Sequence, residues 1–173
     1  DPIAHPEQFK DSPLGLIPRE WHTNSLRQLN DFISYGFTNP MPTTSEGPWM
    51  LTAFDIGDGQ IKFGGARHTS QNAFDTRLSP KSKPKVGDIL VTKDGTLGRV
   101  ARVDHSAICI NQSVAVLHPR QETDANFVLQ FLRSPSGQRA MLAEAGGSTI
   151  KHIYITKLAE VIVPYPEETE RRQ

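Results

Sequence analysis

The spacing of apolar and polar residues along the chain predicts five short strands. In each, β-branched and other apolar residues cluster between turn residues. The strands are expected at 88–92, 98–103, 108–110, 113–117 and 161–163. We expect these five strands to form the core sheet together.

Helical spacing is clearest in the last third of the chain. Apolar residues recur at this spacing from Phe127 to Leu132, which predicts a helix with Asp124 as its N-cap and an end at Ser134. A second helix is expected to begin at Pro135 and to stop at the glycine pair 146–147. Weaker helical patterns cover about 25–32 and 71–77.

The 13 glycines and 13 prolines interrupt the chain throughout, so short elements joined by many turns are expected. Together with the predicted strands and helices, they indicate an α/β fold of the mixed α+β kind. We expect a single domain with a twisted, mostly antiparallel or mixed sheet flanked by short helices.

Charge is balanced over the whole chain but not along it. The 173 residues contain 19 Lys and Arg against 19 Asp and Glu, so the net charge gives no argument for a nucleic-acid partner. The stretch 60–103, however, holds nine basic and three acidic side chains, and we call it the basic segment. A solvated loop explains part of this charge as well as a DNA-binding surface does.

The one cysteine, Cys109, lies in an apolar run, which predicts a buried and inert thiol. A single cysteine excludes a disulfide framework and indicates the cytoplasm. The apolar stretches are too short to cross a membrane, and the first residues lack a signal-peptide pattern.

Motifs for catalysis and for cofactors are absent from the sequence. The glycines at 57–65 fit neither the dinucleotide fingerprint nor the phosphate loop, and the histidines and the cysteine lack metal-binding spacing. The string Asn39-Pro40-Met41-Pro42 lacks the second adjacent proline and the aromatic of a DNA amino-methyltransferase. We therefore predict no catalytic residue, no metal and no cofactor, although a serine nucleophile with His and Asp stays open.

Two glycine-bounded clusters have the side chains for binding. The first, 93–99, is a turn after an apolar strand that presents Lys93, Thr96 and Arg99. A plain hairpin explains the same residues. In the second, 146–152, glycines precede hydroxyl, cationic and imidazole groups that suit phosphates and base edges, and a solvated connector is equally compatible. Its candidate residues are Ser148, Thr149, Lys151 and His152.

Four ordered blocks and a lead-in resemble a known family. They read GDILVTKDGTLG at 87–98, INQSVAVL at 110–117, GSTIKHI at 147–153 and VIVPYP at 161–166, after DSPLGLIPREW at 11–21. In this order they resemble a target recognition domain of the DNA specificity subunit of type I restriction-modification systems.

This resemblance implies a non-catalytic, cytoplasmic reader of double-stranded DNA that addresses one half of a split, asymmetric target. Methylation and cleavage would belong to the methyltransferase (modification) and restriction subunits. The recognition domain would span 1–166, and 167–173 would begin a spacer helix. Two alternatives stay open: the recognition part of a fused methyltransferase-endonuclease, and a protein-docking module without direct DNA contact.

The resemblance also sorts the candidate DNA-binding residues. Those at recurring family positions, in 93–98 and 148–152, are expected to hold the fold or the DNA backbone. Base contacts are expected from the less regular stretch 67–72 and from 35–44, because Arg, Asn and Gln can address base edges bidentately. The candidates there are Arg67, His68, Gln71 and Asn72. We expect 60–103 and 146–152 to meet on one concave, positive surface.

Overall fold

The computed structural model describes residues 2–57, 59–143, 145 and 151–167. Its strands are β1 Phe9–Ser12, β2 Gly15–Pro18, β3 His22–Ser25, β4 Asn30–Tyr35, β5 Thr44–Leu51, β6 Ile56–Gly57, β7 Gln60–Ile61, β8 Arg67–His68, β9 Ile89–Thr92, β10 Val100–Arg102, β11 Ile108–Ile110, β12 Val114–Pro119 and β13 Ile162–Tyr165. Its α-helices are α1 Leu26–Leu29, α2 Gln71–Arg77, α3 Glu122–Arg133, α4 Pro135–Ala143 and α5 Ile155–Ala159. Short 3-10 helices are η1 Pro6–Gln8, η2 Ala53–Asp55, η3 Phe63–Gly65 and η4 Pro80–Ser82.

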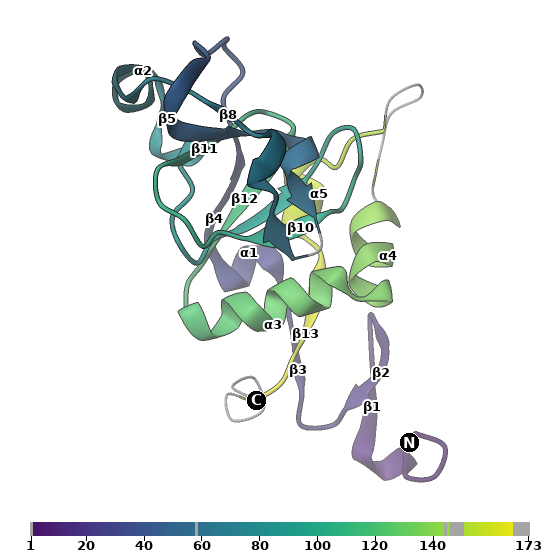
Figure 1. The fold of residues 1–173 in the computed structure, drawn as a ribbon. Coiled ribbons are helices and arrows are strands. Elements are labelled where there is room, and N and C mark those ends of the chain that lie inside the picture. The colour runs from purple at the N-terminus through teal and green to yellow at the C-terminus, as the bar shows by residue number, and fades with distance from the viewer. Residues whose placement is uncertain (1, 58, 144, 146–150, 168–173) are drawn as a thin grey trace.

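The centre of the fold is an antiparallel four-stranded sheet in the order β10-β9-β12-β4. β9 and most of β10 and β12 are buried on both faces, whereas the edge strand β4 is only partly buried. Alternate side chains of a strand point in opposite directions. On β9, Ile89 and Val91 join the core that includes α3 and α4, whereas Leu90 joins the core under β5 and β11. The sheet is therefore the middle of three layers, and Figure 1 shows α3 on one side of it and β5, β8 and β11 on the other.

The third layer is a smaller sheet in the order β11-β5-β8. β11 pairs with β5 in parallel, and β8 pairs with β5 antiparallel. The end of β4 reaches this layer, because the backbone N–H of Phe37 donates to the Ile110 carbonyl at 3.0 Å. This crossing brings the segment after β4 next to the segment after β11.

The mixed fold class is confirmed, but the expected grouping of strands is wrong. Only β9, β10 and β12 of the five predicted strands share the central sheet, which β4 completes. β11 lies in the smaller sheet, and β13 pairs with β3. An apolar run indicates that a strand is buried, but it does not indicate which strand pairs with it.

The bounds of α2, the start of α4 and the end of α3 agree with the sequence, whereas the start of α3 and the end of α1 differ and α5 was not predicted. α3 begins at Glu122 with Gln121 as its N-cap, so Asp124 is not the cap; its carboxylate accepts a hydrogen bond from the Tyr165 hydroxyl at 2.7 Å. The pattern at 25–32 yields only α1, because β4 follows directly at Asn30. α4 begins at Pro135 and α2 spans Gln71–Arg77 as predicted. The glycine pair 146–147 lies outside the described residues.

None of the helices in the described part of the chain combines the length and the apolar character that a membrane span requires. The expected spacer helix at 167–173 lies outside the described residues except for Glu167.

Candidate nucleic-acid interface

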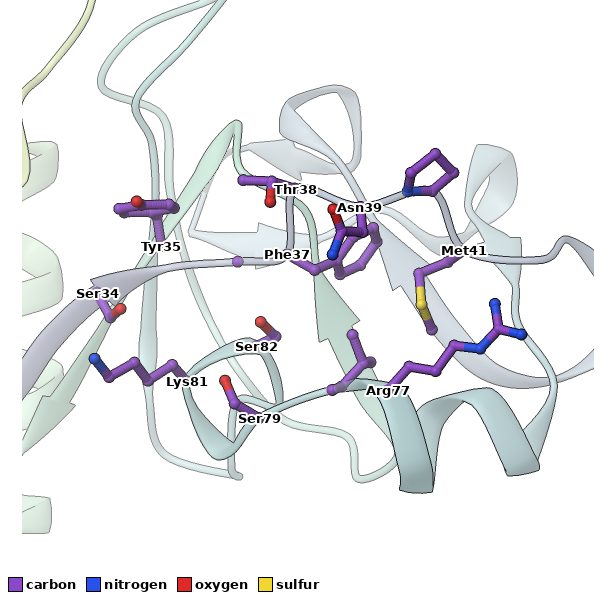
Figure 2. A pocket seen from close by; sticks show the side chains of 13 residues that line it. Ser34, Tyr35, Phe37, Thr38, Asn39, Met41, Arg77, Ser79, Lys81 and Ser82 are labelled. Carbon is purple, nitrogen blue, oxygen red and sulfur yellow. The ribbon is translucent and has the colours of Figure 1, made fainter.

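Three neighbouring hollows, which share lining residues, lie around the ends of β4, α2 and β8. The first, of about 600 Å³, lies between the end of β4 and the segment 77–82, as Figure 2 shows. The second, of about 260 Å³, shares residues 37–41 with the first. The third, of about 570 Å³, shares four residues with the second: Met50, Thr52, Arg67 and Asn111. We call these three neighbouring hollows together the groove.

The floor of the first hollow requires a glycine. A Cβ added to Gly36 would lie 1.8 Å from the Ile110 carbonyl oxygen and 2.6 Å from that of Asn111. The backbone therefore approaches β11 more closely than any side chain permits. This contact positions the segment 37–41 as the wall that the first two hollows share.

Positive charge gathers along two of the hollows. Arg77 and Lys81 extend from one wall of the first hollow, opposite Thr38 and Asn39 (Figure 2), and Arg67 lines the second. All three cations are exposed, and none forms a hydrogen bond or ion pair with any residue that the structure describes. The described residues that line these two hollows include no carboxylate. An anion entering here would meet uncompensated charge.

Amide side chains add hydrogen-bonding groups to the same surface. Asn39, Asn111 and Gln112 line the first two hollows. The Asn111 Oδ1 accepts from the Ser113 backbone N–H at 3.1 Å and from its hydroxyl at 2.6 Å. Its Nδ2 has no partner among the described residues, so the donor is available to a ligand. Arg, Asn and Gln are the side chains that address purine edges bidentately.

The two clusters predicted for binding meet at Asp94. The Lys93 ammonium lies 2.6 Å from one Asp94 carboxylate oxygen, the His152 Nδ1 hydrogen-bonds the other, and the Ile153 N–H donates to the Lys93 carbonyl at 2.9 Å. Burial by itself raises the pKa of Asp94, but hydrogen bonds from Lys93 and His152 and their positive charges outweigh it and lower that pKa. The Lys93 side chain is only 16% exposed and is neutralised locally.

Other members of the basic segment stabilise the fold. The Arg102 guanidinium donates to Asn126 Oδ1 at 2.8 Å and lies 3.5 Å from Glu122, which ties β10 to α3. The Lys83 ammonium lies 4.9 Å from the centre of the Phe74 ring. The excess charge of 60–103 is therefore divided between the groove and structural contacts.

The predicted site residues lie in different environments. Arg67 and Thr96 line the groove. Arg99 is exposed and does not line any of the three hollows, and Lys151 is also exposed. Ser148 and Thr149 lie outside the described residues.

Three further candidates lie on or beside β8. The His68 ring lies against that of Trp49, with the ring centres 3.9 Å apart and the planes tilted by 36°, and its Nδ1 hydrogen-bonds the Gly47 carbonyl at 2.7 Å. The Gln71 amide donates to Asp75 one turn along α2, whereas Asn72 is exposed. For all of these residues, contact with DNA stays a prediction.

The predictions covered Arg77 and Lys81 only as members of the basic segment, and they assigned no binding role to Asn111 and Gln112. The two cations stand within the basic segment, and the two amides interrupt an apolar block directly after β11. Two polar residues directly after a buried strand were the sequence feature that could have indicated a binding role for these amides. Asn39 falls within the stretch 35–44 that was expected to contribute base contacts.

Comparisons with known proteins identify the family. The model of the type I restriction modification DNA specificity domain matches residues 27–173, and the chain belongs to this family. It is 23% identical over 176 residues to the specificity subunit of type I restriction enzyme MjaIX from Methanocaldococcus jannaschii, covering 96% of the chain and 39% of that protein. It is 26% identical over 163 residues to the EcoBI specificity subunit from Escherichia coli, covering 91% of the chain and 34% of the relative.

A solved structure shares the fold. The crystal structure of the HsdS subunit from Thermoanaerobacter tengcongensis superposes with a TM-score of 0.64 at 22% identity, over 98% of the chain and 39% of that subunit. The chain thus spans about two fifths or less of these relatives. The family resemblance inferred from the sequence blocks is confirmed.

Proposed function

We propose that this chain is a target recognition domain that binds double-stranded DNA in the groove and catalyses no reaction of its own. The observation that carries this proposal is the lining of the first two hollows. Three unpaired cations stand there beside amides with available donors, and the described lining includes no carboxylate. Binding of phosphates requires unpaired cations, and recognition of base edges requires hydrogen-bonding groups such as these amides.

The division of labour follows from side-chain chemistry. Arg77 and Lys81 flank the wider hollow and are assigned to phosphates, which position the domain without reading sequence. Arg67, Asn111 and Gln112 are assigned to base edges. Lys93, which was expected to be presented for binding by the 93–99 turn, is not assigned to DNA here, because its side chain is largely buried beside Asp94.

Size limits how much DNA one such domain reads. A compact domain of 173 residues has a radius of gyration of roughly 16 Å. The major groove faces one side for only about half of a helical turn of 10 to 10.5 base pairs. The domain would therefore read a few base pairs, as one half of a split target.

The partners proposed are the methyltransferase and restriction subunits of the same system, which would carry out the chemistry in the cytoplasm. Support comes from the two curated relatives, which are specificity subunits of type I restriction enzymes. The recognition domain is proposed to span 1–166, and 167–173 to begin the spacer.

Binding of a labelled DNA duplex to the full chain, followed by fluorescence anisotropy, tests this function. If Arg77 and Lys81 each neutralise one phosphate, log K should fall with log salt with a slope of about −1.8, or about 12-fold in affinity between about 50 and 200 mM. Lys81→Ala should halve that slope to about −0.9. Arg139→Ala, which removes an exposed cation on α4 away from the groove, should leave it unchanged. Absence of binding at low salt, or binding that is indifferent to salt, refutes the proposal.

A further inference from the structure

Phe54 differs from every other phenylalanine in the chain. Of the eight, seven are buried or partly buried, whereas Phe54 is 86% exposed. Single exposed apolar residues are common on protein surfaces, so exposure alone assigns no role. The rigidity and the location of this ring carry the argument.

Hydrogen bonds hold the turn that carries Phe54. Asp55 Oδ2 accepts from the Thr52 backbone N–H at 2.7 Å and from its hydroxyl at 2.9 Å. The Ala53 N–H donates to the Ser113 hydroxyl at 3.0 Å, and the Lys62 N–H donates to the Asp55 carbonyl at 2.7 Å. These bonds tie η2 to the loops on either side. The ring is therefore presented to solvent by a preorganised turn and not by a loose loop.

The ring lines the third hollow of the groove. This hollow combines apolar walls from Met50, Ala53 and Phe54 with the hydrogen-bonding groups of Arg67 and Asn111. Its two carboxylates already have partners, since Asp55 accepts from Thr52 and Asp94 is bonded to Lys93 and His152. A nucleobase has the same division, with a flat face that stacks on aromatic rings and an edge that accepts and donates hydrogen bonds. An apolar ring beside a cationic DNA-binding surface is also the arrangement by which proteins wedge open a base step.

We propose that Phe54 inserts at a base step of the bound duplex and stacks on the base face that opens there. Arg67 and Asn111 then hydrogen-bond the edge of that base. The inference rests on the proposed function, because it requires DNA in the groove. It makes Phe54 a specificity determinant, since flexible pyrimidine–purine steps such as TA and CA/TG open at the lowest energetic cost.

The test uses duplexes that the wild-type chain selects from a randomised pool. 2-Aminopurine, whose fluorescence rises when it is unstacked, is placed at each position in turn. Wild type should raise the fluorescence at one pyrimidine–purine step. Phe54→Ala should abolish this rise and weaken binding about 5- to 150-fold, the range for loss of one base–aromatic stack. Phe54→Trp should retain both the rise in fluorescence and the wild-type affinity. Val86→Ala, which removes another exposed apolar side chain outside the groove, should behave as wild type.

The outcomes separate this inference from the function on which it rests. Salt-dependent binding that Phe54→Ala leaves intact, with unchanged fluorescence, overturns the inference alone. Loss of binding to a methyltransferase subunit by Phe54→Ala, with DNA binding unaffected, also overturns it and makes Phe54 a protein-docking residue. Failure of the wild-type chain to bind any duplex at low salt overturns both. Because Phe54 is exposed, its variants should unfold at the wild-type urea concentration, which excludes misfolding as the cause.

Discussion

Replacing Gly36 with alanine should destabilise the protein by about 2–4 kcal/mol. The new Cβ would lie 1.8 Å from the Ile110 carbonyl oxygen, whereas Cβ atoms in proteins essentially never lie within 3.0 Å of another non-bonded heavy atom. The end of β4 must therefore move more than 1 Å away from β11. That shift breaks two backbone hydrogen bonds of Phe37. Its N–H donates to the Ile110 carbonyl at 3.0 Å, and its carbonyl accepts from the Gln112 N–H at 2.9 Å.

The magnitude combines three contributions. Two backbone hydrogen bonds contribute about 1 kcal/mol each, and forcing an extra carbon into a packed site costs about 1–3 kcal/mol. Restricting the unfolded chain at this position offsets about 0.4–1 kcal/mol. The first hollow should widen as well, since Gly36 lines it. Weaker DNA binding is therefore expected even where the variant is still folded.

Urea unfolding followed by tryptophan fluorescence measures this effect. The matched control is Gly64→Ala, because a Cβ at Gly64 meets no atom within 4 Å and the residue does not have a positive φ. The control should unfold within about 0.5 kcal/mol of wild type. A Gly36→Ala protein that is equally stable would show that β4 does not pack on β11 as described, and the groove would lose its floor.

Two further predictions concern titratable groups. The pKa of Asp94 is held below its ordinary value of 3.8, so its contribution to stability is present above about pH 4 and is lost as the pH falls through the lowered pKa. Between about pH 7 and pH 3, the free energy of urea unfolding should thus fall more for wild type than for Asp94→Asn, and equal falls would contradict the described contacts. Burial raises the pKa of the Cys109 thiol to about 12, so a thiol reagent at neutral pH should label it only when urea unfolds the protein. Rapid labelling of the native protein would show that β11, which carries Cys109, is not buried.

The elements that the sequence predicted well are those with local signals. α2 was predicted at its observed bounds, where the Ser70 hydroxyl accepts from the Ala73 N–H at 3.2 Å. α4 begins at Pro135, which favours a first helical turn. The capping prediction for α3 was wrong because the helix begins at Glu122, which places Asp124 inside its first turn. The Asp124 carboxylate accepts instead from Tyr165, a residue 41 positions away. That contact has no local signature.

The family could also be read from the sequence, because its recurring blocks are linear strings. The groove could not be predicted from the sequence. Arg67 on β8, Arg77 at the end of α2 and Asn111 after β11 meet only because β11 pairs in parallel with β5 and β4 crosses onto β11. Nothing in the spacing of these residues along the chain encodes that meeting.

By itself, therefore, the sequence determined five of the buried strands, the bounds of α2, the start of α4, the uneven charge and the family. The tertiary structure decided which cations remain unpaired and which side chains share a surface. The physical reason is that apolar periodicity and capping act over a few residues, whereas strand pairing and ion pairing depend on neighbours far away in the chain. Lys93 and Lys81 are both lysines of the basic segment, yet one is ion-paired with Asp94 and the other is exposed in the groove.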